Sequence, residues 1–307
     1  MGYDRIRIKT SARQILRETS PRPWAVTLLL WFLLADLLAL CLLPLMATGL
    51  FSAPAGERPP LLPILLGVVL GVGLLLLSLI LHAGYAAYTL QLWRQEGPAG
   101  FADLLVGFFS ASQILDLWVR LLVYTLLWAA PGTGLLLWLD HLAAVPDPVP
   151  LLVWVLSALK LLYPLYLLER VSRYAMALFA LMDKPEAGAQ QAIDRSKRLM
   201  AGRKVDLLVF LLSVLGWWLV IVLVAGIFFL VGGALLALVA GEAAQPDLTQ
   251  AAGLLLPFLL LGLAAVIPLL LWLTAYIGTA LAGFYATAAA PPFPGLQPPE
   301  FRRRDQL

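Results

Sequence analysis

Two residues of opposite charge, Asp36 and Lys160, lie near the middle of long apolar stretches of the sequence. An ionisable side chain is costly within hydrocarbon, so residues of this kind often mark the path of an ion, a proton or a substrate. Because their predicted depths in a membrane are similar, the two side chains are candidates for a central polar site. A structural ion pair between them, or two unrelated roles, are the alternatives.

A second charged pair, Asp116 and Arg120, has a simpler interpretation. The two residues are one helical turn apart, which places them on the same face of a helix. Arg120 also lies near the predicted end of its apolar segment, where a long side chain can extend toward the lipid headgroups. We therefore predict a structural ion pair between Asp116 and Arg120.

The sequence contains no motif of established catalytic or metal chemistry. His82 and His141 are the only histidines and lie far apart, and the single cysteine, Cys41, lies within an apolar run. We find no HExxH zinc motif, no GxSxG nucleophile motif and no Walker phosphate loop. We therefore expect a protein without enzymatic activity, and no metal or cofactor.

The composition indicates that these residues belong to a membrane protein. Of the 307 residues, 62% are apolar and only 13% are charged, and the mean hydropathy is +0.90. A soluble domain carries about 25% charged residues. The expected fold is therefore an all-α, polytopic bundle of transmembrane helices.

Hydropathy predicts six apolar segments, each long enough to cross a bilayer as a helix. They cover residues 24–50, 61–93, 115–139, 149–168, 207–240 and 248–287. The number of spans is least certain within 131–168 and within 248–287. The last segment is long and contains Pro257 and Pro268, but two spans there would place the C-terminal arginines outside. We therefore predict one span whose first part is broken or interfacial.

The loop charges predict the orientation of the chain. Of the 21 Lys and Arg residues, 18 fall in the leader, in alternate connections and in the tail, all on one side of the membrane. Basic loops favour the cytoplasmic side. We therefore expect a multi-pass protein of the bacterial cytoplasmic membrane with both termini in the cytoplasm. Its parts are a basic amphipathic leader at 1–23, a transmembrane domain at 24–288 and a Pro-rich tail at 289–307.

A basic amphipathic helix is predicted on the cytoplasmic side at about 183–202. Asp183 is its expected cap, and Gly202 follows it as a helix-ending residue. Its predicted headgroup-binding residues are Arg195, Lys197, Arg198 and Arg203. The leader has a similar pattern, with Arg13 and Arg17 beside Ile8, Ala12, Ile15 and Leu16. Such helices serve either as topology signals and membrane-edge anchors or as docking and lipid-sensing surfaces.

One further pattern resembles a known family. Its central part consists of Ala192, Ser196, Leu199, Met200, Gly202 and Lys204, followed by Leu212, Ser213, Leu215, Gly216 and Trp217. The other matching residues are Gly84, Tyr85, Arg94, Phe101, Leu104, Gly107, Phe108, Tyr174, Met176, Leu181, Asp183, Phe284 and Tyr285. Together they resemble the bacterial integral-membrane family DUF975. The resemblance implies a six-helix membrane protein and no established activity.

Physically, the central motif predicts an elbow. Gly202 lets the chain turn from the interfacial helix into the next span, and Arg203 and Lys204 hold the junction at the headgroups. Ser213 and Gly216 would provide a small helix face for close contact, with Trp217 filling the space beside it.

Two functions remain open from the sequence. The first is a non-enzymatic accessory or scaffold component of the cell membrane, with a membrane-protein partner or a second copy of itself. The alternative is a small-molecule or lipid transporter with a central site near Asp36 and Lys160. In either case we expect contact with anionic lipid headgroups on the cytoplasmic side, and no nucleic-acid partner.

Overall fold

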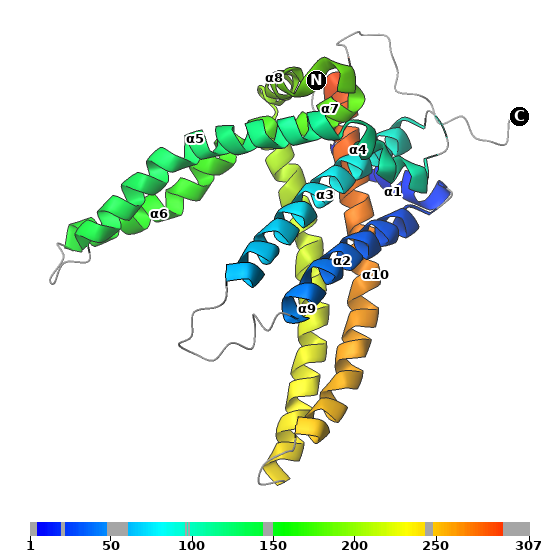
Figure 1. Ribbon diagram of the computed structural model, residues 1–307, viewed down its shortest axis with the longest axis vertical. Coiled ribbons are helices and arrows are strands. Elements are labelled where there is room, and N and C mark those ends of the chain that lie inside the picture. Colours follow the sequence, from blue (N-terminus) through cyan, green and yellow to red (C-terminus); the bar gives the residue numbers. More distant parts are fainter. Residues whose placement is uncertain are drawn as a thin grey trace, which may run out of the picture.

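The computed structural model describes residues 5–19, 22–47, 61–95, 97, 99–143, 150–242 and 248–290 (Figure 1). Within these ranges the chain forms helices and short connections, and no strand. The chain thus has the all-helical fold that its composition predicts. The predicted Pro-rich tail beyond residue 290 lies outside the described residues.

The helices follow one another in a simple order. Those of the first half are α1 (Arg5–Glu18), α2 (Pro23–Ala47), α3 (Leu61–Arg94), η1 (Phe101–Leu105), α4 (Val106–Phe109), α5 (Ala111–Ala143) and α6 (Pro150–Val171). Those of the second half are η2 (Ser172–Tyr174), α7 (Ala177–Asp183), η3 (Pro185–Ala187), α8 (Gly188–Met200), α9 (Lys204–Glu242) and α10 (Leu248–Ala289).

Among the described residues, five helices are long and apolar enough to cross a membrane: α2, α3, α5, α9 and α10. The predicted fourth span, α6, is not one of these five. α6 packs along α5 as the second arm of a hairpin (Figure 1). The chain therefore has the apolar helices of a membrane protein, and the count of six spans stays a prediction.

The last helix, α10, is continuous through Pro257 and Pro268. Neither proline breaks it, so the predicted break is wrong, while an interfacial first part stays a prediction. Its 42 residues correspond to about 63 Å of helix, and hydrocarbon is about 30 Å thick. Its partner α9 is similar in length, so both helices can cross a bilayer and still extend beyond it.

The helices form three paired arms that diverge from a common helical cap (Figure 1). The arms are α2 with α3, α5 with α6, and α9 with α10. We use the name helical cap for α1, η1, α4, α7 and α8 with the adjoining ends of α3, α5, α9 and α10. The largest fully buried side chains lie in or next to this cap, among them Tyr88, Phe210, Tyr276 and Tyr285. Along the arms, apolar side chains such as Phe229 are exposed, as expected for surfaces that face lipid.

Glycine allows unusually close packing within the cap. A Cβ atom on Gly84 would overlap the carbonyl oxygen of Leu104, and one on Gly107 would overlap that of Ile80. α3 therefore meets the η1–α4 segment backbone against backbone. Small residues permit this kind of approach between helices in membranes. The contact explains why Gly84 and Gly107 belong to the family-like pattern.

The two amphipathic helices bury their apolar faces against protein. Ile8, Ala12 and Ile15 of α1 are buried, and α1 packs mainly on α10. Ala192 and Ile193 of α8 are also buried, and α8 packs on α7 and α5. These faces therefore contribute to the core of the cap and are not available to insert into lipid.

The predicted helix at 183–202 begins later than expected. Asp183 is the last residue of α7, and α8 begins only at Gly188, after the short η3 turn. Gly188 has a φ of +80°, a backbone conformation that favours glycine. Asp183 is therefore not the cap of this helix, because the turn at Pro185 separates the two.

Candidate functional site

Asp183 is the centre of a buried polar cluster that joins four helices. Its side chain is only 7% exposed. One carboxylate oxygen, Oδ1, accepts a hydrogen bond from Arg94 Nη2. The other, Oδ2, lies 2.8 Å from Arg195 Nη1 and accepts a hydrogen bond from the Tyr285 hydroxyl at 2.8 Å. One carboxylate thus connects α3, α7, α8 and α10.

Local sequence explains how these side chains reach Asp183. α7 is a single short helix that buries Phe179, Ala180 and Leu181, which fixes its C-terminal residue inside the cap. Arg94 lies in the last turn of α3, where a positive charge also interacts favourably with the helix dipole. The Tyr285 ring stacks on Phe179 with ring centroids 6.1 Å apart.

The electrostatics of the cluster favour an ionised carboxylate. Burial by itself raises the pKa of the Asp183 carboxyl. The hydrogen bonds from Tyr285 and Arg94 and the positive charges of Arg94 and Arg195 outweigh burial and hold this pKa below its usual range. The Arg195 guanidinium also lies 5.5 Å from the centre of the Tyr285 ring, a cation–π contact. The carboxylate oxygens are bound by three donors. The cluster is therefore better suited to holding the helices in fixed positions than to transferring a proton.

Ser196 forms a second buried connection. Its side chain is fully buried; its hydroxyl donates to the Arg173 carbonyl oxygen at 2.8 Å and accepts a hydrogen bond from the Met176 amide at 3.2 Å. A buried hydroxyl of this kind satisfies backbone groups that the irregular chain between α6 and α7 leaves without a helical partner. Met200, also in the family-like pattern, is fully buried in the same core.

The predicted elbow at Gly202 is present. Gly202 has a φ of +77° between α8 and α9, which lets the chain reverse direction at low cost. Arg203 Nη1 donates to the Ala288 carbonyl oxygen at 3.0 Å, and Lys204 forms an ion pair with Glu169. The hydrogen bond from Lys204 is the main cause that lowers the pKa of the Glu169 carboxyl. The elbow therefore connects the ends of α6 and α10 to the start of α9.

The mid-membrane charges Asp36 and Lys160 do not meet. Lys160 Nζ donates to Asp140 Oδ1 at 2.6 Å, across the α5–α6 hairpin. Asp36 is exposed on α2, which belongs to a different arm (Figure 1). Asp140 lies just beyond the predicted apolar segment 115–139, but α5 continues to Ala143, and this extra helical length brings Asp140 to Lys160. The hypothesis of a shared central site therefore lacks its geometric basis.

Asp116 and Arg120 lie together as the sequence predicts. Arg120 Nε is 2.8 and 2.9 Å from the two carboxylate oxygens of Asp116. Arg120 Nη1 also donates to Gln190 Oε1 at 3.3 Å, which links α5 to α8.

Three of the four predicted headgroup residues have partners inside the cap. Arg195 pairs with Asp183, Lys197 pairs with Asp194 at 3.1 Å, and Arg203 binds the end of α10. Arg198 is exposed on the surface of α8. The basic residues of α8 therefore hold the cap together as well as giving it positive charge.

The small-residue face predicted on α9 makes different contacts. The Ser213 hydroxyl donates to the Phe210 carbonyl oxygen of its own helix. A Cβ atom on Gly216 would have no heavy atom of a neighbouring element within 4 Å, so Gly216 does not provide a close helix contact. Trp217 instead packs edge to face on Trp272 of α10, with ring centroids 5.1 Å apart. The large aromatic side chains keep the two helices apart at this level.

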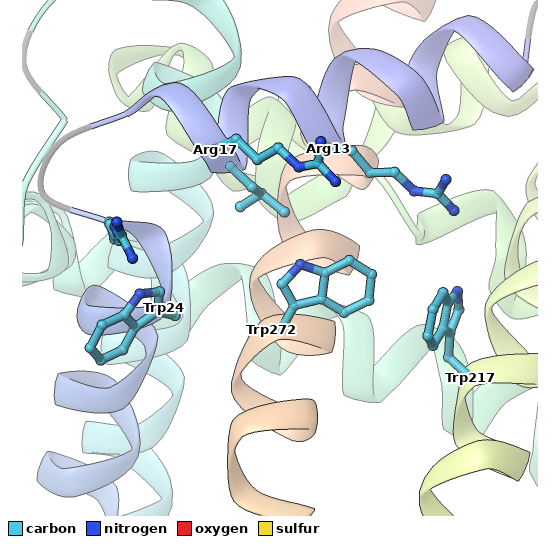
Figure 2. A pocket seen from close by; sticks show the side chains of 7 residues that line it. Arg13, Arg17, Trp24, Trp217 and Trp272 are labelled. Atoms are coloured by element: carbon cyan, nitrogen blue, oxygen red, sulfur yellow. The ribbon is translucent and has the colours of Figure 1, made fainter.

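A basic, aromatic pocket of about 490 Å³ lies beneath α1 (Figure 2). Its lining combines residues from four helices or their flanks: Arg13, Leu16, Arg17, Arg22, Trp24, Trp217 and Trp272. Arg13 and Arg17 belong to the amphipathic leader predicted from the sequence. The sequence did not indicate that these side chains enclose one pocket.

Within the part of the chain that the structure describes, no group of three or more His, Cys, Asp and Glu side chains is placed to hold a metal ion.

Comparison with protein families identifies the family of the chain. The profile of a family described as "Protein of unknown function (DUF975)" matches residues 1–290. No curated protein and no solved structure matches the chain.

Proposed function

The chain belongs to the DUF975 family, whose function is unknown, and from this premise we propose that it is a non-enzymatic accessory or scaffold component of the bacterial cell membrane. In this proposal the arms cross the bilayer and the helical cap lies on the cytoplasmic side. The cap positions the arms, and their exposed apolar faces contact lipid, a membrane-protein partner or a second copy of the chain.

The Asp183 cluster carries this proposal. A carboxylate with three donors from three other elements fixes α3, α7, α8 and α10 relative to one another. A buried ion pair of this kind contributes little net stability but strongly penalises any arrangement that separates its members. It suits a protein that must present its helices in one fixed geometry.

The exposed arms support the same function. Side chains such as Trp154, which is 76% exposed, and Phe229, which is 82% exposed, project from the α5–α6 and α9–α10 arms. Lipid tails can cover such side chains, and so can the helices of another membrane protein. Diverging arms leave more of this surface available to a partner than a closed bundle would.

The transporter alternative has less support. It requires polar groups gathered at one place within the membrane, and Lys160 is instead paired with Asp140 inside its own hairpin. The side chain of Asp36 lies on another arm. Neither residue therefore offers the shared site on which that alternative was based.

Two measurements on the full-length chain test the proposal. The chain is extracted with its surrounding lipid in a membrane-active polymer, and the mass of the particle is measured by native mass spectrometry. We expect a defined complex with a second membrane protein or with further copies of the chain. The same preparation in proteoliposomes should give no solute flux above that of empty vesicles. A monomer that transports a solute, with transport abolished by Asp36→Asn, would overturn the proposal.

A further inference from the structure

The pocket beneath α1 has the chemistry of an anion site at a membrane surface. Figure 2 shows Arg13 and Arg17 on α1 above Trp272, with Trp24 and Trp217 on either side. Its volume of about 490 Å³ is within the range of ligand sites, roughly 300–1,000 Å³. The pocket is therefore large enough for a phosphorylated headgroup with part of its glycerol.

The arginines give the pocket a net positive charge. All three of its charged lining residues, Arg13, Arg17 and Arg22, are basic. Neither Arg17 nor Arg22 has an ion-pair partner among the described residues. The Glu18 carboxylate accepts a hydrogen bond from Gln14 at 3.0 Å and lies with Arg13 and Arg17 around an adjoining pocket. Because three arginines stand against this one carboxylate, a net positive charge remains available to an external anion.

Trp24, Trp217 and Trp272 form the aromatic floor of the pocket, and ring contacts hold the last two in place. Trp272 packs edge to face on Trp217 and stacks on Tyr276, with ring centroids 5.1 and 5.3 Å apart respectively. The Arg13 guanidinium lies 5.8 Å from the centre of the Tyr276 ring, which orients it over this floor. The site is therefore held largely preformed, which reduces the entropy lost on binding.

The helix that carries the arginines is also held in place. Ile15, one residue from Leu16 of the pocket, is 2% exposed, and Ala12 is fully buried. α1 packs on α10, the helix that supplies Trp272. Arg13 and Arg17 are one helical turn apart, so both project from one face of α1.

We propose that this pocket binds the phosphate of an anionic phospholipid, with the arginines on the phosphate and the tryptophans against the glycerol and the upper acyl chains. Arginine suits this role because its planar guanidinium can donate two parallel hydrogen bonds to phosphate. Tryptophan suits it because its ring is apolar and its indole N–H is a donor. The three positive charges oppose binding of a cationic ligand.

The position of the tryptophan floor favours a lipid over a soluble phosphate compound as the ligand. Trp24, Trp217 and Trp272 all belong to helices that are candidate membrane spans. The pocket therefore opens where the apolar arms meet the basic α1. This inference rests on the proposed membrane location and adds a defined headgroup site to it.

The test compares two variants that remove the same charge from full-length protein. Arg17→Gln with Arg22→Gln changes the pocket, and Lys184→Gln with Arg120→Gln changes exposed basic residues outside it. The probes are short-chain phosphatidylglycerol and short-chain phosphatidylcholine, added to detergent-solubilised protein, and bound lipid is counted by native mass spectrometry. We expect the pocket variant to bind phosphatidylglycerol about tenfold or more weakly, since each arginine near anionic lipid contributes about 1 kcal/mol. The control variant should bind it as the unmodified chain does, and phosphatidylcholine should bind more weakly than phosphatidylglycerol.

Each other outcome overturns the inference in a distinguishable way. Equal weakening in the two variants would mean diffuse attraction to a basic surface. Unchanged binding in the pocket variant would exclude the pocket. Inorganic phosphate that displaces the lipid at equal concentration would identify a soluble phosphate compound as the ligand. Because the mass of the membrane complex is measured separately, failure of the pocket leaves the proposed scaffold role to its own test.

Discussion

Arg94 at the end of α3 and Asp183 at the end of α7 form an ion pair, although 89 residues of sequence separate them. The pair joins two segments that belong to different parts of the chain. Tyr285, a further 102 residues beyond Asp183, donates to the same carboxylate. Contacts between residues this far apart in the sequence hold the helical cap together.

Removing the buried charge should destabilise the cap strongly. Asp183→Asn leaves Arg94 and Arg195, which are 31% and 28% exposed, without their carboxylate. Breaking a buried pair costs about 3–5 kcal/mol, and the partial exposure of both guanidiniums favours the lower end of that range. Unfolding monitored by circular dichroism in detergent measures this loss.

Asp116→Asn is the matched control, because its carboxylate is exposed and pairs within one helix. It should leave the unfolding midpoint nearly unchanged. A loss as large as that of Asp183→Asn would contradict the special role of the buried cluster.

Acid should weaken the cap through the same carboxylate. The pKa of Asp183 in the folded chain is lower than in the unfolded chain, so its ionisation stabilises the fold fully above the ordinary carboxyl pKa. That contribution is lost as the pH falls from the ordinary value through the lowered one. We expect the stability difference between the unmodified chain and Asp183→Asn to shrink over this interval. A difference that stays constant with falling pH would disprove the linkage.

Ser196→Ala should cost more than an equivalent change on the surface. The substitution leaves the buried Met176 amide and Arg173 carbonyl without their partner, at about 1–3 kcal/mol. Ser172→Ala is the control, because its hydroxyl donates to the Glu169 carbonyl oxygen in an exposed setting. Denaturation curves of the two variants should separate clearly, and coincident curves would argue against the buried connection.

Replacing a glycine of α3 by alanine should lower the stability of the protein at one position and not at another. Gly84→Ala forces a methyl group against the Leu104 carbonyl, and overpacking of this kind costs about 1–3 kcal/mol or more. Gly71→Ala meets nothing within 4 Å and should leave stability unchanged or raise it by up to about 1 kcal/mol. Thermal midpoints of the two variants measure the contrast, and similar midpoints would be inconsistent with the close backbone contact.

A double-mutant cycle distinguishes the two possible partners of Lys160. Lys160→Met combined with Asp140→Asn should show a coupling energy of about 0.5 kcal/mol or more, as for an ion pair with partial exposure. Lys160→Met combined with Asp36→Asn should show additive effects. Unfolding of the three single and two double variants and of the unmodified chain in detergent gives both coupling energies. Coupling to Asp36 alone would restore the central site.

Features that depend on local sequence were predictable. The length and apolar character of α9 and α10 follow from composition, and the turn at Gly202 follows from a glycine at the end of an amphipathic segment. The one-turn spacing of Asp116 and Arg120 is likewise enough to place both on one face of α5.

Features that depend on distant partners were not predictable. Asp183 looks like a helix cap when only its neighbours are considered, because the residues that bind it come from α3, α8 and α10. Lys160 was grouped with Asp36 because their predicted depths in the membrane are similar. The hairpin of α5 and α6 instead brings Asp140 to Lys160. The pocket beneath α1 needs tryptophans from three helices, and no spacing within the sequence reveals that meeting.

The contact between α1 and α10 has a consequence for biogenesis. α1 packs against α10, a helix that is synthesised much later in the chain. Until α10 is made, Ile8 and Ala12 lack residues that belong to the same buried cluster in the folded protein. The cap is therefore completed only after α10 has been synthesised, and a nascent chain arrested before α10 should expose this face of α1 to chaperones and proteases.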